Sequence, residues 1–184
     1  MKPKICKGCK TSFDPYQPFQ QVCSPPCALV VAIKQREKAA TTFKRKQARE
    51  TRVKLKTRRE WLREAQAAIN KWVRLRDDNL PCISCGRHHT GQYHAGHYLT
   101  TGSRPELRFN ELNIHKQCAP CNNHLSGNLI MYRVGLIAKI GLADVESLEG
   151  PHPPSKWTIE QLKEIKVEYK RRVRGLTDEQ GKSS

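Results

Sequence analysis

The sequence predicts a small, zinc-stabilised α+β protein in which compact modules are joined by long basic helices. Three observations lead to this expectation. Eight cysteines fall into four closely spaced pairs, residues 28–80 contain neither Gly nor Pro, and 34 Lys and Arg residues stand against 17 acidic ones. A chain of 184 residues is long enough for one modest domain with extensions, or for two small domains.

The cysteines are expected to hold metal rather than to form disulfides. No apolar run after Met1 has the form of a signal peptide, so the chain is expected in the cytoplasm, where thiols stay reduced. No run approaches the roughly 18 apolar residues that cross a bilayer, and no membrane partner is expected. Cysteine pairs separated by two or three residues suit tetrahedral zinc. The predicted structural zinc ligands are Cys6, Cys9, Cys23 and Cys27 at one site, and Cys82, Cys85, Cys118 and Cys121 at the other.

Residues 1–27 are expected to form the first zinc-binding module. Its aromatic residues Phe13, Tyr16 and Phe19 lie between the two cysteine pairs and are predicted to cover the metal. Zinc binding contributes on the order of 10 kcal/mol of folding free energy to a module too small to build its own hydrophobic core.

Residues 28–80 are predicted to form a basic helical segment that contacts DNA, mediates dimerisation, or does both. Residues 34–76 hold 16 basic and 4 acidic side chains, a balance that attracts polyanions such as nucleic acid. A solvated basic linker is the alternative for residues 34–60. The predicted DNA-contacting residues are Lys44, Arg45, Lys46, Arg49, Arg52, Lys54, Lys56, Arg58 and Arg59.

The end of this segment carries an apolar stripe at helical spacing. It consists of Trp61, Ala65, Ala68, Ile69, Trp72 and Leu75. Such a stripe must pack against another apolar surface. The surface of a second subunit and the chain's own core are the two alternatives.

Residues 81–142 are predicted to form the core module, and residues 143–184 a linker, a C-terminal helix and a disordered tail. Ser126–Ile140 is expected to be helical, and the Gly- and Pro-rich stretch that follows is expected to be the linker. The last helix is predicted to begin at Thr158, with Gln161 as its capping-box partner, and to end at Gly175.

The core module contains the kinds of side chain that phosphodiester hydrolysis requires. That reaction needs a base to activate water and a cation to stabilise negative charge on the phosphate. His97 lies in a stretch that reads as a strand, His94 precedes it by three residues, and Asn122 directly follows the predicted zinc ligand Cys121. Because Mg²⁺ keeps several waters, one or two protein ligands suffice. The segment therefore reads as a small nuclease core.

This segment resembles the HNH, or ββα-metal, nucleases, in which two strands and a helix hold one catalytic metal. The resemblance implies that His97 is the general base, that Asn113 braces the loop carrying it, and that Asn122 binds Mg²⁺ or Mn²⁺. The residue before the base is commonly a metal-binding Asp in those enzymes, but it is Gly96 here. His94 is the expected replacement as metal ligand.

The whole chain resembles the NinG (Rap) recombination family of lambdoid phages. The resemblance rests on residues 94–98, 107–110, 113–115 and 117–122, together with Ser126, Asn128 and Tyr132. It implies a structure-selective endonuclease that cuts Holliday junctions and related branched DNA, including D-loop-like substrates, in the cytoplasm of a bacterial host. Because resolving a four-way junction takes two matched cuts, a homodimer is expected.

Two other functions remain open from the sequence. One is a zinc-stabilised DNA-binding or annealing protein that does not cleave, whose junction binding would be unchanged when His97 is replaced. The other is a nuclease or nickase of the HNH type without structural selectivity, which would cut duplex and junction equally.

Overall fold

The computed structural model describes residues 2–182, and the chain divides into two compact units, with the boundary between Lys56 and Thr57. This boundary lies inside the predicted basic segment 28–80. The two units are therefore described one at a time.

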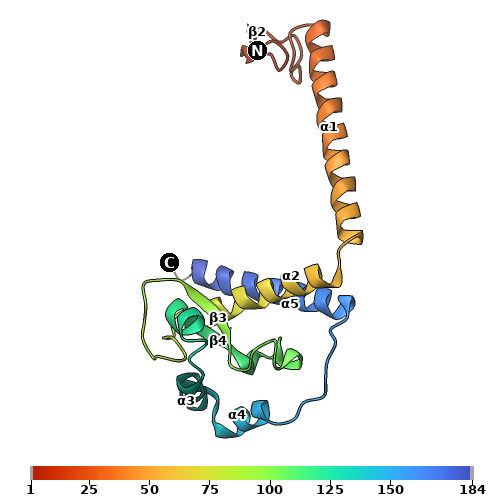
Figure 1. Cartoon of the computed structure of the whole chain (residues 1–184). Helices are drawn as coiled ribbons and strands as arrows, with labels where there is room; N and C mark the ends of the chain where they lie inside the picture. The colour runs from red at the N-terminus through yellow and green to blue at the C-terminus, as the bar shows by residue number, and fades with distance from the viewer. Residues whose placement is uncertain (1, 183–184) are drawn as a thin grey trace. The chain divides into compact units, whose positions relative to one another are not determined.

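The first unit consists of a cysteine knuckle and one long helix (Figure 1). Strands β1 (Lys4–Ile5) and β2 (Ser12–Phe13) pair antiparallel beside the first cysteines. Helix α1 spans Pro25–Lys54, and its prolines lie in the first turn, where a missing N–H costs nothing. At 30 residues α1 is about 45 Å long, and none of its residues is buried. The charged face of α1 is thus fully open to solvent.

The long basic segment forms two helices. Helix α1 ends at Lys54, and helix α2 spans Arg58–Arg76. The start of α2 is fixed by a capping box: the Thr57 hydroxyl accepts from the Glu60 N–H at 3.3 Å, and the Glu60 carboxylate accepts from the Thr57 N–H at 2.9 Å. A Thr-x-x-Glu signature inside a run without Gly or Pro therefore marks the break.

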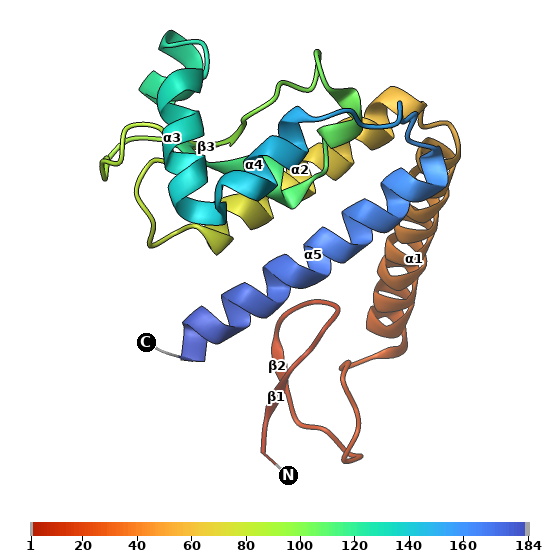
Figure 2. The same cartoon turned by 90° about the horizontal axis from the view of Figure 1, so that it is seen from below.

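The second unit is built around a two-stranded antiparallel hairpin (Figures 1 and 2). Strand β3 (Tyr93–His97) pairs with β4 (Ile114–Cys118), with Tyr93 opposite Cys118 and His97 opposite Ile114. A π-helical turn over Pro120–His124 follows, and then come helices α3 (Leu129–Ile140), α4 (Leu142–Glu149) and α5 (Ile159–Lys182). The prediction of a small α+β protein is confirmed.

Helices cover both faces of the hairpin. Helices α2 and α5 lie side by side, and the apolar stripe of α2 packs on α5 and on Ile114 of β4. On the other face, Tyr132 of α3 donates a hydrogen bond to the Gly96 carbonyl at 2.9 Å and accepts one from the His115 N–H at 3.1 Å. The stripe is therefore covered by the chain's own core and not by a second subunit. It is no longer a candidate dimer surface.

Two features of the chain after the hairpin differ from the sequence prediction. Helix α3 begins at Leu129 rather than Ser126, because Ser126, Gly127 and Asn128 all have positive φ. The predicted linker contains helix α4, whose Val145 and Leu148 are buried against Tyr132 and Leu136.

The C-terminal helix is longer than predicted. Its start is as expected, since the Gln161 side chain and backbone exchange hydrogen bonds with Thr158 at 2.9 and 3.2 Å. It passes through Gly175 and extends to Lys182 because Leu176 still packs on the core beside α2. Residues 183–184, the end of the predicted disordered tail, lie outside the described residues.

Candidate metal centres and the histidine hairpin

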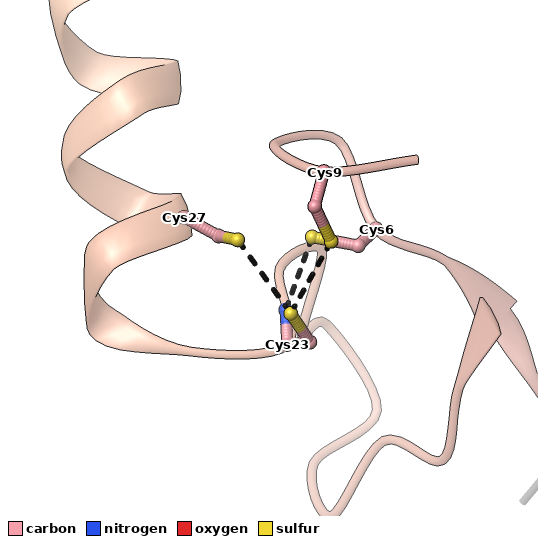
Figure 3. A group of neighbouring side chains, drawn as sticks. All are labelled: Cys6, Cys9, Cys23 and Cys27. Carbon is pink, nitrogen blue, oxygen red and sulfur yellow. Dashed lines mark hydrogen bonds between the residues drawn. The ribbon is translucent and has the colours of Figure 1, made fainter. Parts of the chain in front are cut away.

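The first cysteine cluster brings four sulfurs from separate segments to one point (Figure 3). The sulfur atoms of Cys6, Cys9, Cys23 and Cys27 all lie within 4.8 Å of one another, and Cys23 is 3.6 Å from both Cys9 and Cys27. Sulfurs on the corners of a tetrahedron around zinc would be about 3.8 Å apart, given Zn–S bonds of about 2.3 Å. The donor set and its spacing fit a closed structural zinc site.

Two of the three aromatic side chains of this module, Tyr16 and Phe19, do not cover the cluster as predicted. Phe19 is 92% exposed and Tyr16 is 76% exposed. Cover comes instead from the backbone, because the N–H groups of Gly8 and Cys23 point at the Cys6 sulfur at 3.4 and 3.3 Å. Backbone donors of this kind stabilise a thiolate.

The second cluster lies where strand β4 ends, and three of its four cysteines are buried. The sulfurs of Cys82, Cys85, Cys118 and Cys121 also lie within 4.8 Å of one another, and the Cys118 N–H points at the Cys82 sulfur at 3.3 Å. Burial and the neighbouring Cys121 and Cys82 thiols raise the pKa of Cys118 to about 12. Four thiolates packed this closely need a dication, so this set too fits structural zinc.

This cluster fixes the two segments that flank the hairpin. The loop between Cys82 and Cys85 presents the Ile83 carbonyl to α3 so closely that a side chain at Gly135 would overlap with it. On the other side, Asn128 donates to the Cys121 sulfur at 3.6 Å. The four cysteines thus determine how closely α3 approaches the loop between Cys82 and Cys85.

Sequence reasoning missed His89 as a partner of this cluster. Its Nε2 lies 3.2 Å from the Cys85 sulfur, and its backbone N–H donates to the Tyr93 hydroxyl at 2.6 Å. A histidine four residues after a cysteine ligand is the signal that was available. His89 is half-buried between this cysteine and Tyr93.

The hairpin presents its two candidate catalytic histidines on opposite faces. Side chains alternate between faces along a strand, and His94 and His97 are three residues apart in an unbroken register. Ala95, which shares the face of His97, packs on the core formed by α2 and α5. Gly96, which shares the face of His94, is hydrogen-bonded to Tyr132 of α3. The structure does not bring the two imidazoles together on one surface.

His97 is held as a neutral, oriented imidazole. Its Nε2 lies 3.1 Å from the Arg108 carbonyl, which can only accept, so Nε2 carries the proton. Burial lowers the pKa of His97 below its usual value, and the Arg108 charge lowers it further, although the hydrogen bond acts in the opposite direction. None of the described residues forms a hydrogen bond with Nδ1. That nitrogen is available to take a proton.

Asn113 clamps the loop that follows His97. It is fully buried. Its side-chain carbonyl accepts from the Leu99 N–H at 2.8 Å, and its side-chain amide donates to the backbone carbonyls of Leu99 and Leu107 at 3.0 and 3.2 Å. In addition, the Tyr98 N–H donates to the backbone carbonyl of Asn113 at 2.9 Å. The loop between His97 and Arg108 is thereby fixed to the start of β4.

His94 has a buried nitrogen that is left without a partner. Its Nε2 and the Oε1 of Gln117 are the two buried side-chain polar atoms, among residues 2–178, that make no hydrogen bond. These residues are direct cross-strand neighbours on one face. Buried polar atoms are nearly always paired, so an orphaned imidazole nitrogen points to a missing ligand or water.

Gly96 has a steric reason not to be an Asp. A Cβ at this position would overlap with Oε1 of Gln117. The Gln117 amide is held in place by bonds to the Ser84 hydroxyl at 2.7 Å and the Gly127 carbonyl at 2.6 Å. An Asp side chain therefore has no room at position 96.

Asn122 lies on the π-helical turn directly after the buried Cys121, and it is half-buried. Its amide donates to the Asn123 side chain at 2.8 Å, and its side-chain carbonyl oxygen makes no hydrogen bond within the described residues. No hydrogen bond in the described chain joins Asn122 to either histidine of β3.

Sequence reasoning also missed a buried ionic network at the end of α2. Asp77 is 2% exposed and accepts from the Lys116 backbone N–H at 3.1 Å, from Arg76 at 2.8 and 2.9 Å, and from Lys139 at 2.9 Å. Burial alone would raise the pKa of Asp77, but the hydrogen bonds and the charges of Arg76 and Lys139 outweigh it and hold the pKa well below its usual range. In sequence, Asp77 looks like part of an ordinary polar turn.

The same network fixes His115 in a structural role. Arg76 donates to its Nδ1 at 3.1 Å, so Nε2 carries the proton and donates to the Leu112 carbonyl at 3.0 Å. Burial lowers the pKa of His115 and keeps the ring neutral. Both ring nitrogens are occupied, and this histidine is unavailable to a substrate or a metal.

Comparison with known proteins assigns the family. The model of a family described as "Bacteriophage Lambda NinG protein" matches residues 1–179. The chain belongs to the NinG family. It is 43% identical to Protein ninG of Salmonella phage P22 and to Protein ninG of Escherichia phage lambda, over 97% of this chain and 96% of each relative. It is 40% identical to Protein ninG of Escherichia phage 933W over the same shares. No solved structure gives a significant match.

The predicted DNA-contacting residues of this NinG chain divide between the two units. Lys44 to Lys54 lie on the open helix α1, whereas Arg58 and Arg59 begin α2. Arg58 donates to the Trp157 carbonyl at 2.7 Å and so also ties α2 to the segment before α5. Within residues 2–182, none of the helices has the length and apolar character that a bilayer crossing requires.

Proposed function

We propose that this NinG-family protein is a divalent-metal-dependent DNA endonuclease of the HNH type that acts on Holliday junctions and related branched DNA during phage recombination. One observation carries the proposal. His97 is a neutral, oriented imidazole at the end of a strand, with its Nδ1 unoccupied among the described residues. A buried structural histidine has no need of such a free nitrogen.

The residues around His97 support a role as general base. The Arg108 carbonyl orients the ring, and the Asn113 clamp fixes the loop that carries this carbonyl. In the proposed reaction, Nδ1 of His97 accepts a proton from the water that attacks the phosphorus. The lowered pKa keeps the base unprotonated at neutral pH.

The proposed metal ligands are His94 and Asn122. Support comes from the orphaned Nε2 of His94 and from the carbonyl oxygen of Asn122, which has no partner among the described residues. A mixed nitrogen and oxygen donor set suits Mn²⁺ and allows Mg²⁺ with retained waters. When bound, the ion would supply positive charge to stabilise the phosphorane and the departing 3′ oxygen.

The protein is proposed to act as a homodimer, because resolving a four-way junction requires two matched cuts. Since α5 covers the apolar stripe of α2, the dimer contact must involve another surface. The mass of the protein in solution, measured with and without a junction, tests this part of the proposal separately.

One observation favours a second candidate function, that of a zinc-stabilised DNA-binding or annealing protein. His94 and His97 project from opposite faces of the hairpin, which counts against their acting on one phosphate. In that case His97 would be dispensable for every function of the protein.

The deciding experiment uses a labelled synthetic four-way junction beside its linear duplex, with Mg²⁺, Mn²⁺ or EDTA. Wild type is compared with His97→Ala and with His152→Ala, a control histidine that bonds only to the Ser147 carbonyl. Paired, metal-dependent cuts lost only in the His97 variant are expected. Tight binding without cutting under any metal would establish the binding protein instead, and equal cutting of both substrates would establish a nuclease or nickase without structural selectivity.

A further inference from the structure

A basic groove runs along the second unit, and none of its residues is among the named DNA-contacting residues between Lys44 and Arg59. It consists of two pockets that share Lys71 of α2. One pocket, of about 560 Å³, lies between the end of α2, the loop after Cys85 and the hairpin, and includes Arg74 and Lys116 in its wall. The other, of about 640 Å³, lies between α2 and α5 and includes Lys170 and Arg174. Because Lys71 lines both, the two pockets are neighbours on the surface of the unit.

Four cations line this groove without an ion-pair partner among the described side chains. Lys71, Arg74, Lys170 and Arg174 form no ion pair with any residue that the structure describes. They form two rows, at i and i+3 on α2 and at i and i+4 on α5, where like charges repel each other. Such rows are unfavourable for the isolated protein and become favourable when a polyanion lies between them.

Two further cations of the groove are held by neighbouring groups, and the exposed carboxylate of Asp78 makes no ion pair with a described residue. Lys116 is only 5% exposed, donates to the Asp78 carbonyl at 2.6 Å and lies over the Tyr93 ring at 4.3 Å. Lys166 is bonded to Glu64 at 2.6 Å. The free positive charge of the groove therefore comes from the four exposed or half-buried cations of its rim.

We propose that this groove binds the phosphodiester backbone of DNA and forms a second contact surface, separate from helix α1. Small side chains of Ala67 and Ala68 line the α2 side of the groove and let a backbone approach closely. The Tyr93 ring in the groove is covered by Lys116, so it offers no platform for stacking unpaired bases. The chemistry favours duplex backbone, read by charge and not by base sequence.

This inference rests on the proposed function only in taking DNA as the ligand. It places the arms of the substrate against the unit that carries His97 and the second zinc cluster. DNA would then be held by the catalytic unit itself, whether or not the basic helix α1 also contacts it.

The test measures binding in EDTA, where cleavage plays no part. The anisotropy of a labelled duplex and of a labelled four-way junction is recorded across a salt series for three double variants. Two variants alter the groove, Lys71→Gln with Arg74→Gln and Lys170→Gln with Arg174→Gln. The matched control, Lys156→Gln with Arg171→Gln, removes the same charge from exposed positions outside both pockets.

Each groove variant is expected to weaken binding by one to two orders of magnitude at about 0.1 M salt, and to reduce the slope of log K against log salt by about 2, since each lost duplex phosphate contact reduces it by about 0.9. The control is expected to change affinity by less than about threefold. The zinc content of each variant is measured to detect a folding defect. The single variant Lys71→Gln, which changes only an exposed side chain, is included for the same purpose.

Equal weakening in groove and control variants, or none in the groove variants, would overturn the proposal. Groove-dependent binding by a protein that never cuts would support the groove and reject the nuclease. Junction cutting that persists in every groove variant with unchanged affinity would reject the groove and leave the nuclease intact.

Discussion

The carboxylate of Asp77 lies 3.1 Å from the backbone nitrogen of Lys116 and so joins the C-terminal end of α2 to the middle of strand β4. Through Arg76 the same carboxylate is connected to Nδ1 of His115, and through Lys139 to helix α3. This one buried anion thus connects the helices on both faces of the hairpin that carries His97. The network holds these elements together and has no part in the proposed chemistry at His97.

Asp77→Asn is expected to lower the free energy of unfolding by about 3–5 kcal/mol, because it leaves buried cations without their anion. Because the pKa of Asp77 is depressed in the folded protein, its contribution is present above the unfolded pKa of about 3.9 and is lost as the pH falls further. Urea unfolding at pH 7 and at pH 3 measures both effects. The neighbouring exposed Asp78→Asn serves as control, and an equal loss in the two variants would contradict the prediction.

Activity is expected to rise with pH through a midpoint below about 6.5 and to level off above it, because His97 must be neutral to act as a base and its pKa is lowered. Arg108→Gln removes a charge that lowers this pKa but keeps the backbone carbonyl, so the midpoint should move up. Arg87→Gln, which removes a charge from an exposed turn, should leave it unchanged. Single-turnover rates from pH 5 to 8 measure the midpoints, and a flat profile would exclude His97 as the base.

Structural and catalytic metals should respond to different substitutions. Cys118→Ser is expected to lower the zinc content from two ions to one per chain and to unfold the second unit, because the cluster holds the hairpin to the loop after Cys82. Asn122→Ala should retain both zinc ions and abolish cleavage. Elemental analysis beside circular dichroism distinguishes the two, and zinc loss in the Asn122 variant would show that the sites are not separate.

Asn113→Ala is expected to cost about 1–3 kcal/mol of stability, because it leaves buried groups of Leu99 and Leu107 unpaired. It should also lower kcat more than it raises KM, since the loop that orients His97 is released. Asn110→Ala, which loses a single bond to the Leu112 N–H, is the matched control. Destabilisation without any change in kcat would confine Asn113 to a structural role.

Gly96 and Gln117 should be energetically coupled. Gly96→Ala alone is expected to destabilise the protein by about 1–3 kcal/mol, because its methyl group overlaps with the Gln117 side chain. In Gln117→Ala that obstacle is absent, so the double variant should be more stable than the sum of the single effects by at least about 1 kcal/mol. Additive effects in a double-mutant cycle would contradict the packing described here.

The sequence by itself determined the local features of this protein. Cysteine spacing predicted both four-sulfur clusters, and the Thr158–Gln161 signature predicted the start of the last helix. The family resemblance was likewise confirmed by comparison with the phage NinG proteins. These features depend on residues close together in the chain, or on ligand chemistry that only a few residue types supply. Both can be recognised from residue type and spacing alone.

Only the tertiary structure decided which surfaces meet. An apolar stripe such as that of Trp61 to Leu75 shows that a surface must be buried, but not whether a second subunit or α5 buries it. In the same way, two histidines three residues apart look like a pair in the sequence, yet the pleat of β3 places them on opposite faces. The Asp77 network and the contact of Gly96 with Gln117 join residues between 21 and 62 positions apart. Long-range packing of that kind leaves no local periodicity to read, because the energy that selects it comes from burial in the folded chain.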